Sequence, residues 1–401
     1  MKNVKIVIGA NFGDEGKGLM TDYFCSQFPK DEKVLNARFN GGAQAGHTVV
    51  EPNGRRHVFG HFGAGSFLPN VATYLGPEFI VNPILFRREW EKLREKGIFP
   101  MVYCHPNCIL TMPQDMMVNQ FIEKRRVDGR HGSCGVGIYE TILRSKETAY
   151  DAYVREADVY WTKHSCMPDP DYYNYERIEK ITGFPLLEEE KALLVNQNIR
   201  AHYLEDLRFF MDHVVLIDAR IFKRFDNVVF EGAQGLMLDQ NNFDFFPHLT
   251  PSNTGIDNIL KFLGEDMDIE VCYVTRPYLT RHGAGKLPDE CTREEVGAKV
   301  DLTNHENEWQ GALRYGKLNV KDLYVRCEKD FKKALNLYMD LNIKKCFAFT
   351  HMDEFATKDN EFPFISNVTG EETITEVIDK CDGFYASHGP TRCDIGGCIT
   401  F

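Results

Sequence analysis

Residues Val4–Gly18 (VKIVIGANFGDEGKG) join a short apolar run, a glycine-rich turn and a helical pattern without a break. Val4–Ile8 are mostly β-branched and end at a glycine, which indicates a strand buried on both faces. From Lys17 onward, apolar residues recur at helical spacing. Glycines let backbone N–H groups approach an anion, and a helix N-terminus adds partial positive charge. The stretch therefore predicts an α/β fold with a P-loop-like phosphate site, where the Lys17 ammonium lies beside a phosphate oxygen.

The turn departs from a standard phosphate-binding loop at informative positions. A standard loop has Gly at the position of Asn11, and it has Ser or Thr at the position of Gly18. Asp14 and Glu15 add carboxylates to a loop that should hold anions, which is unfavourable unless one of them ligates Mg²⁺ or acts as a general base. The alternative is a solvated turn with two incidental acids. The flanking glycines favour the catalytic interpretation.

Composition excludes several classes of function. The chain has 401 residues, 43% of them hydrophobic, and its 47 Lys and Arg against 59 Asp and Glu give a net charge of −12. Because non-specific nucleic-acid binding depends on neutralising phosphates, we expect no nucleic-acid partner. No apolar run approaches the roughly 20 residues of a membrane span, so we expect neither a membrane partner nor a signal peptide. The 12 cysteines include no CxxC pair, which favours reduced thiols and a cytoplasmic location.

A second glycine-rich turn, GGAQAGHT (Gly41–Thr48), follows a strand predicted over Val34–Asn40. Turns at the C-terminal ends of parallel strands are where α/β sheets bind ligands. His47 stands between Gly46 and Thr48 in this turn, which makes it a catalytic candidate. The alternative is a structural histidine whose hydrogen bonds are satisfied internally.

Three further segments repeat the pattern of a turn at the end of an element. HGSCGVGIYE (His131–Glu140) is a glycine-rich turn that opens a helix, with Ser133 at a capping position, and VVFEGAQG (Val228–Gly235) is a strand that ends in a glycine turn. CFAFTHMDEF (Cys346–Phe355) is a strand followed by Thr-His-Met-Asp. The Asp353 carboxylate can accept two parallel hydrogen bonds from guanine N1–H and N2–H₂, a pair that adenine does not offer. The alternative is a helix-capping acid.

NFGDEGKG resembles the signature loop of the adenylosuccinate synthetases. That family phosphorylates the 6-oxygen of a purine nucleotide with GTP and then displaces the phosphate with the amine of aspartate. GGAQAGHT is similar to the family's GGHNAGHT. The resemblance implies that Asp14 takes the purine N1 proton, that His47 is the general acid at the 6-oxygen, and that Lys17 neutralises phosphate. It also implies a Mg²⁺ ion held by Asp14 and the Gly46 carbonyl.

Further motifs match the family in order as far as Arg392. FEGAQG, PHLTPSNTG, YLTRHGAGKLP, THMD and SHGPTR resemble the family's FEGAQG, YPYVTSSNTT, STRVGAGPFP, TKLD and STGPDR. The residues implied to hold GTP are Gly13, Glu15, Gly16, Gly18, Thr48, His351, Asp353, Ser387, Gly389 and Pro390. Those implied to hold the nucleoside monophosphate or aspartate are Asn11, Gln44, Ser133, Arg144, Gln234, Thr250, Thr303, Asn304, Gln310 and Arg314. Arg144 resembles an arginine that reaches across a dimer interface to the partner's substrate, which implies a homodimer.

The main departure is LTNHENEWQGALRYGKLN (Leu302–Asn319), where the family has an arginine-rich TTGRRRRTGW. Only Arg314 of that basic run remains, so Thr303, Asn304, Gln310 and Arg314 must share the recognition of aspartate. In the family this run also holds the ribose 2′-hydroxyl, and its loss relaxes the rejection of a 2′-deoxynucleotide. NEWQGALRYG is similar to the divergent phage branch that makes the 2-aminoadenine precursor, N6-succino-2-amino-2′-deoxyadenylate, from dGMP.

We therefore predict dGMP as the acceptor, with IMP, the substrate of ordinary purine biosynthesis, as the alternative. Members of the phage branch often lack the loop carboxylate. Asp14 is present here, which fits either an early member of that branch or an ordinary synthetase with an unusual aspartate loop. GTP is the expected energy donor, with ATP left open, and the location would be the host cytoplasm if the chain is phage-encoded. Two rivals of other classes are a GTP-binding switch, which would hydrolyse GTP slowly without aspartate, and a catalytically dead scaffold.

The expected architecture is one α/β domain over residues 1–401, built around a large, mainly parallel sheet. Residues 150–225 are polar, aromatic and helical in pattern. We expect them to form an all-helical insertion and not a separate domain.

Overall fold

A ten-stranded sheet forms the centre of the computed structural model, which describes residues 1–126, 133–147, 153–157, 175–301, 304, 311–337, 341–355 and 380–396. The strand order is β17-β16-β15-β11-β1-β10-β2-β5-β7-β9. All neighbours pair in parallel except β16 and β17, so the predicted large, mainly parallel sheet is confirmed. The strands are β1 (Lys2–Gly9), β2 (Val34–Arg38), β5 (Val71–Leu75), β7 (Met101–Cys104), β9 (Val215–Leu216), β10 (Asn227–Gly235), β11 (Met267–Thr275), β15 (Asn342–Phe349), β16 (Gly383–Ser387) and β17 (Ile395–Gly396).

β1 lies in the middle of this sheet, between β10 and β11. Its central residues Ile6, Val7 and Ile8 are fully buried, because side chains of both faces pack against other elements. The strand predicted over Val4–Ile8 is thus confirmed and extends one or two residues further at each end. The strand predicted over Val34–Asn40 is shorter than expected and ends at Arg38.

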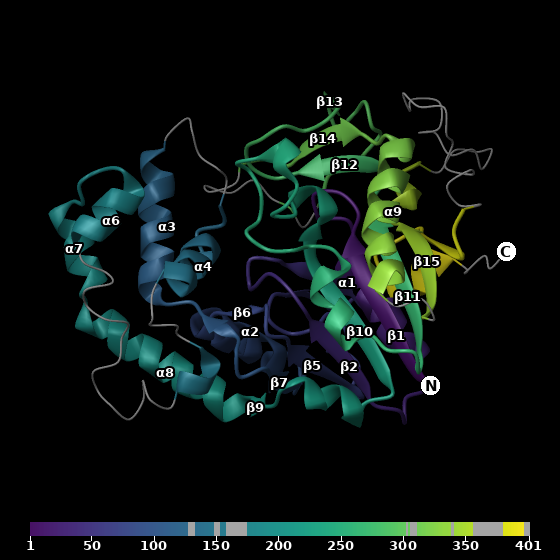
Figure 1. The fold of residues 1–401 in the computed structure, drawn as a ribbon, viewed down its shortest axis with the longest axis horizontal. Helices are drawn as coiled ribbons and strands as arrows, with labels where there is room; N and C mark the ends of the chain where they lie inside the picture. Colours follow the sequence, from purple (N-terminus) through teal and green to yellow (C-terminus); the bar gives the residue numbers. More distant parts are fainter. Residues whose placement is uncertain are drawn as a thin grey trace.

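Eight helices of the described residues surround the sheet, and Figure 1 shows α3, α4, α6 and α7 gathered at one end of the molecule, with α9 and β15 at the other. α2 begins after Asn82, whose side chain accepts a hydrogen bond from the Leu85 N–H over 3.2 Å. α3 begins at Pro113, because a proline suits the first position of a helix and the Asp115 side chain accepts a hydrogen bond from the Met112 N–H. The helices are α1 (Lys17–Gln27), α2 (Pro83–Glu95), α3 (Pro113–Arg125), α4 (Ile138–Glu147), α6 (Tyr175–Thr182), α7 (Glu188–Leu194), α8 (Gln197–His213) and α9 (Val320–Leu337).

The segment expected to be an all-helical insertion is mixed. In the part of residues 150–225 that the structure describes, α6, α7 and α8 are followed by β9, which pairs in parallel with β7 at the edge of the sheet. α8 packs along α2 through Tyr203, Leu207 and Phe210, all buried. The described part is thus helical from α6 to α8, and the two residues of β9 then join the edge of the central sheet.

Smaller sheets complete the fold. β12 (Tyr278–Arg281), β14 (Arg314–Lys317) and β13 (Glu290–Cys291) form an antiparallel sheet, β3 (His47–Val50) pairs with β4 (Arg56–Phe59), and β6 (Ile80–Val81) pairs with β8 (Ile109–Leu110). Among the described residues, ten cysteines are free thiols and no helix is long and apolar enough to cross a membrane. β12 follows β11 after two residues, so this small sheet lies beside the C-terminal edge of the large one.

Candidate active site

The loop between β1 and α1 is a compact backbone turn at the C-terminal end of the central strand. Gly13, Asp14 and Gly16 have positive φ angles of 106°, 55° and 91°. Gly16 is the residue that caps α1, so the first N–H groups of that helix face the loop. The predicted strand–turn–helix is confirmed, and its geometry is that of an anion-binding turn.

Segments that follow four other strands contact this loop. The Thr350 hydroxyl, after β15, donates to the Glu15 carbonyl over 2.8 Å, and the Asn11 amide donates to the Thr275 hydroxyl of β11 over 2.8 Å. Gln234, at the end of β10, packs against Gly13. A methyl group on Gly18 would lie 2.9 Å from the Thr48 carbonyl oxygen and 3.0 Å from His47 Cβ, so only glycine at position 18 lets the histidine turn approach α1. The predicted turns that contain His47, Gln234 and Thr350 thus meet around one loop.

Lys17 and Glu15 are both buried inside the loop, with Nζ and Oε2 4.0 Å apart. Burial lowers the pKa of Lys17 and raises the pKa of Glu15 to about 7. Glu15 Oε1 accepts the Asn11 N–H over 2.6 Å, whereas Oε2 has no hydrogen-bond partner among the described residues. The loop therefore already contains one buried cation and one buried acid whose charge states depend on each other.

Asp14 is the part of the loop that reaches out toward solvent. Its side chain is 30% exposed, and its Oδ2 lies 3.5 Å from Nε2 of His282. Its carbonyl oxygen accepts a hydrogen bond from Nε of Arg276, which is itself paired with Asp301 at 2.8 Å. Contacts from the β11 side therefore fix the backbone of Asp14 while the carboxylate remains accessible.

His47 is buried and its Nδ1 is bound to Oε1 of Glu231, a fully buried residue of β10. The other carboxylate oxygen of Glu231 accepts from Asn36 Nδ2 over 2.9 Å and from the Ala64 N–H over 3.0 Å. Burial lowers the pKa of His47 to about 4 although Glu231 opposes this shift. Burial thus favours the neutral imidazole while the adjacent Glu231 carboxylate favours the charged one, and Nε2 is the nitrogen left for substrate because Nδ1 is bound to Glu231.

Sequence reasoning missed Glu231 as a member of the site. The FEGAQG motif contains it, and a carboxylate inside an otherwise apolar buried strand was the signal that could have found it. The buried carboxylate of Glu231 orients the imidazole of His47, as in sites where a histidine acts as base or acid.

The histidine turn also offers groups for nucleotide and metal. Oε1 of Gln44 and the hydroxyl oxygen of Thr48 are buried without a hydrogen-bond partner among the described residues, and Gly46 is exposed. No group of three or more His, Cys, Asp or Glu in the described residues could hold a metal. Mg²⁺ prefers few protein ligands together with phosphate oxygens and water, so the Asp14 carboxylate and an exposed backbone carbonyl at Gly46 fit this ion.

Two residues predicted to bind the nucleoside monophosphate are positioned beside the loop. Gln234 has a positive φ of 63° and follows the buried part of β10. Thr250 is half-buried, and its N–H donates to the Leu238 carbonyl over 2.9 Å. The hydroxyl of Ser133, before α4, donates to Asn119 Oδ1 over 2.8 Å. Their roles toward substrate stay predictions.

The side chains of Asn11 and Arg144 are bound within the protein. The Asn11 side chain is committed to the protein, because Oδ1 accepts from Arg326 and Nδ2 donates to Thr275. Arg144 is 0% exposed, and its Nε and Nη2 lie 3.1 and 3.0 Å from the carboxylate of Asp115. The guanidinium is therefore held inside the α3–α4 pair, and its contact with a partner's substrate stays a prediction.

The segment that replaces the arginine-rich run is partly described. Thr303 and Gln310 lie outside the described residues. Asn304 donates its backbone and side-chain N–H groups to Asp301 over 3.0 and 2.9 Å. Arg314 binds Glu290 at 2.7 Å and the carbonyls of Gly283 and Gly285 at 3.0 and 2.8 Å. Asn304 and Arg314 are therefore engaged within the protein, and their contact with aspartate stays a prediction.

The predicted base-binding residues lie after β15 and β16. Asp353 is exposed and pairs with Lys299 at 2.8 Å. Nδ1 of His351 lies 2.9 Å from the Thr350 hydroxyl, and burial holds the pKa of His351 well below its usual range.

The loop after β16 holds Ser387, Gly389 and Pro390. The Ser387 hydroxyl donates to the Gly389 carbonyl over 2.6 Å, and Gly389 packs against Asp394. Arg392, two residues after Pro390, pairs with Asp22 of α1 at 2.9 Å. This tie brings the loop to the helix whose N-terminus faces the phosphate site.

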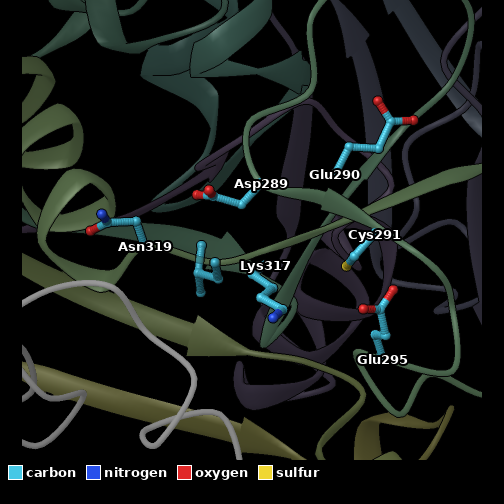
Figure 2. Close-up of a pocket in the computed structure, with 7 residues that line it drawn as sticks. Asp289, Glu290, Cys291, Glu295, Lys317 and Asn319 are labelled. Atoms are coloured by element: carbon cyan, nitrogen blue, oxygen red, sulfur yellow. The ribbon is translucent and has the colours of Figure 1, made fainter.

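A hollow of about 250 Å³ lies elsewhere, along β13 and β14 (Figure 2). Figure 2 shows three carboxylate residues and one lysine around it. Its lining residues are Asp289, Glu290, Cys291, Glu295, Lys317, Leu318 and Asn319. None of the predicted site residues lines it, so it is separate from the phosphate loop.

Comparisons with known proteins agree on one family. A model of the adenylosuccinate synthetase family matches residues 6–312. The chain is 30% identical to the adenylosuccinate synthetase of Acaryochloris marina over 303 residues, which are 75% of this chain and 65% of that protein. It is 28% identical to that of Parabacteroides distasonis over 400 residues, 93% of this chain and 87% of that protein. The match thus spans just under two thirds of the first relative and most of the second.

Solved structures show the same fold. A fully ligated adenylosuccinate synthetase from Plasmodium falciparum is similar with a TM-score of 0.66 and 19% identity, covering 98% of this chain and 99% of that one. The succinoaminodeoxyadenylate synthetase of cyanophage S-2L, bound to dGMP and to dATP as an energy donor, is similar with a TM-score of 0.62 and 17% identity, covering 100% and 96%. At these identities both likenesses concern the fold.

Proposed function

Because the chain belongs to the adenylosuccinate synthetase family, a family of GTP-dependent ligases, we propose that it joins L-aspartate to C6 of a purine nucleoside monophosphate. One observation carries this proposal. The accessible Asp14 carboxylate and the His47–Glu231 pair come from loops at the C-terminal edge of one sheet, and both loops pack on the same α1 N-terminus. An acid, a base and an anion site in that arrangement suit phosphoryl transfer followed by displacement.

Each residue has a chemical task in this proposal. Asp14 accepts the N1 proton, so that the 6-oxygen becomes nucleophilic toward the γ-phosphoryl group. His47, held at Nδ1 by Glu231, presents Nε2 to that oxygen and stabilises the charge that develops on it. Lys17 and the first N–H groups of α1 bind the transferred phosphoryl group. Mg²⁺, held by Asp14 and the Gly46 carbonyl, would neutralise phosphate charge when bound.

GTP is the proposed energy donor, because the Asp353 carboxylate can read guanine N1–H and N2–H₂. Its surface pair with Lys299 is a weak one that a base can displace. The fold neighbour from cyanophage S-2L was bound to dATP as an energy donor, so ATP and dATP are the alternatives to test.

We propose dGMP as the acceptor, which would make the product N6-succino-2-amino-2′-deoxyadenylate. Support comes from the segment at 301–314, where the family's arginines are replaced and Arg314 is bound to Glu290 and to two carbonyls. With Arg314 bound within the protein and the other arginines of the run replaced, the donors that favour a ribose 2′-hydroxyl are reduced, which relaxes the rejection of a deoxyribose. The fold neighbour bound to dGMP agrees with this proposal, whereas the curated relatives, which are adenylosuccinate synthetases, favour IMP.

The experiment is a substrate matrix with the purified chain, Mg²⁺ and aspartate. IMP, dIMP, GMP and dGMP are each combined with GTP, ATP or dATP, and phosphate release and the succinylated nucleotide are both quantified. We expect product from dGMP with GTP, dependent on aspartate. A kcat/KM that favours IMP over dGMP tenfold, about 1.4 kcal/mol of transition-state binding, would overturn the proposed acceptor. Slow GTP hydrolysis that is independent of aspartate would instead indicate a GTP-binding switch.

A further inference from the structure

His282 is a second histidine at the reacting carboxylate, and the function above does not use it. Its Nε2 lies 3.5 Å from Asp14 Oδ2, and its side chain is 15% exposed. It occupies the position of the valine in the family motif STRVGAGPFP, since this chain reads LTRHGAGKLP there. A side chain that cannot hydrogen-bond has thus been replaced by one that can, next to the proposed general base.

The strand order places His282 and His47 on opposite sides of Asp14. β1, which carries the Asp14 loop, lies between β10 and β11. His47 is bound to Glu231 of β10 and follows β2, the strand beyond β10. His282 follows β12, which continues directly from β11. The carboxylate therefore has one imidazole on the β10 side and another on the β11 side.

This arrangement corresponds to three neighbouring positions of a purine ring. N1 lies between C6 and C2, so a ring with N1 at Asp14 and its 6-oxygen toward His47 turns its C2 substituent toward His282. A 2-amino group has two N–H donors, which can be accepted by a neutral imidazole nitrogen and by a carboxylate oxygen. The C2 hydrogen of hypoxanthine offers no such donor.

We propose that His282 is a specificity-determining residue that accepts a hydrogen bond from the 2-amino group of the acceptor purine. This inference rests on the proposed ligase function and names how its site distinguishes a guanine from a hypoxanthine nucleotide. Nε2 is the nitrogen available for the contact, because Nδ1 of His282 is buried. A valine at this position would leave a 2-amino group facing an apolar surface, with a donor unsatisfied.

The residues on either side of His282 hold it in place. Arg281 is buried and donates to the carbonyls of His248 over 2.8 Å and of Lys286 over 2.7 Å. Gly283 adopts a positive φ of 70°, and its carbonyl accepts from Arg314 over 3.0 Å. Arg314, the one arginine left from the basic run, thus anchors the loop that presents His282. Fixed placement is what discrimination of one amino group requires, because a mobile acceptor would adapt to either purine.

The test compares dGMP with dIMP, which differ only in the 2-amino group, in the wild-type enzyme and in His282→Val. We expect the ratio of kcat/KM for dGMP to that for dIMP to fall about tenfold or more in His282→Val, with the dIMP value changed less than about twofold. His282→Gln, which keeps an amide oxygen as acceptor, should restore part of the ratio. An unchanged ratio in His282→Val, whether both values fall together or neither falls, would overturn the inference and leave His282 only a neighbour of Asp14.

A binding measurement separates this inference from the acceptor proposal. Calorimetric titration of both nucleotides into wild-type enzyme and His282→Val, with thermal unfolding to verify folding, reports discrimination without turnover. If the wild-type enzyme succinylates dIMP and not dGMP, the proposed acceptor is wrong. In that case the inference about His282 still holds if His282→Val lowers the affinity for dGMP relative to that for dIMP. It is overturned if this ratio of affinities is unchanged.

Discussion

The β10 and β11 sides of the phosphate loop differ in what their polar groups are bound to. On the β10 side, His47, Glu231, Asn36 and the Ala64 N–H form a buried chain that ends at an imidazole nitrogen left for substrate. On the β11 side, Asp301 accepts hydrogen bonds from Arg276 and from Asn304, while Arg314 binds Glu290. The first set points one group into the site, whereas the second ties loops of the protein together.

We infer from this difference that residues on the β10 side serve the proposed reaction, whereas residues on the β11 side serve the recognition of its substrates. The β10 side matches the family's motifs, and a buried network of this kind tolerates little change because each unsatisfied partner costs about 1–3 kcal/mol. The β11 side carries the replaced arginine run, and the half-exposed pair of Arg314 with Glu290 there can be exchanged at a lower cost. A chain can therefore keep phosphoryl-transfer chemistry while its acceptor site changes.

The largest effect is expected from Asp14→Asn, which removes the proposed general base between the two sides. Turnover with aspartate and the acceptor should fall about 10²–10⁴-fold, the usual contribution of a general base, while GTP binding persists. Steady-state kinetics and nucleotide titration measure the two quantities. Asp289→Asn is a matched control, since Asp289 also has a positive φ and lines the separate hollow. Near wild-type turnover in Asp14→Asn would remove Asp14 from the mechanism.

Glu231→Gln tests whether the β10 side works by orienting His47. A glutamine would either turn N–H donors toward Asn36 Nδ2 and the Ala64 N–H, or donate to Nδ1 of His47 and so reverse the tautomer of the imidazole. We expect kcat to fall about 10²-fold with the acceptor KM nearly unchanged. Glu89→Gln is the control, because Glu89 is buried beside His57 and His61 away from the loop. Equal losses of kcat in both variants would mean a structural role only.

The fold and the reacting loop could be predicted because both depend on local patterns. β1, the glycine turn and α1 are contiguous, and strand, turn and helix each have their own signature in adjacent residues. Asp14, Lys17 and His47 were identifiable since each stands inside such a turn.

Other roles depend on contacts between distant parts of the chain. Glu231 meets His47 across 184 residues, and only the order of β2 and β10 brings them together. Arg144 was assigned from a motif, but Asp115, which caps α3, captures it when α3 and α4 pack. No pattern around Asn11 indicates that Arg326 of α9 reaches it. Motifs therefore locate a site, while packing decides which of its side chains remain free.

Asp353→Asn tests a third side of the phosphate loop, after β15, where the base of the energy donor is proposed to bind. Exchange of an acceptor for a donor should lower kcat/KM for GTP about tenfold and raise it for xanthosine triphosphate. Initial rates with the two donors measure the change. Lys299→Ala is the control, as it removes the surface pair and leaves the carboxylate. Equal use of GTP and ATP by the unmutated enzyme would contradict a base-reading role.

The smallest effect is expected from Arg314→Ala on the β11 side. Because its guanidinium is bound to Glu290 and to backbone carbonyls, the KM for aspartate should change less than about twofold, and thermal unfolding should report a loss of about 1 kcal/mol or less. A tenfold rise in the aspartate KM would instead show that Arg314 leaves these partners to clamp a carboxylate.

At Asp14, the residue that would make the fold most stable differs from the residue that the proposed catalysis needs, because φ is positive there. A side chain other than glycine in the left-handed region costs about 1 kcal/mol, somewhat less for Asp than for most residues. A glycine there would relieve that strain and make the chain harder to unfold, yet it would remove the carboxylate. Selection for thermal tolerance alone would therefore tend to erase the reactive group, and Asp14 persists only while turnover is also selected.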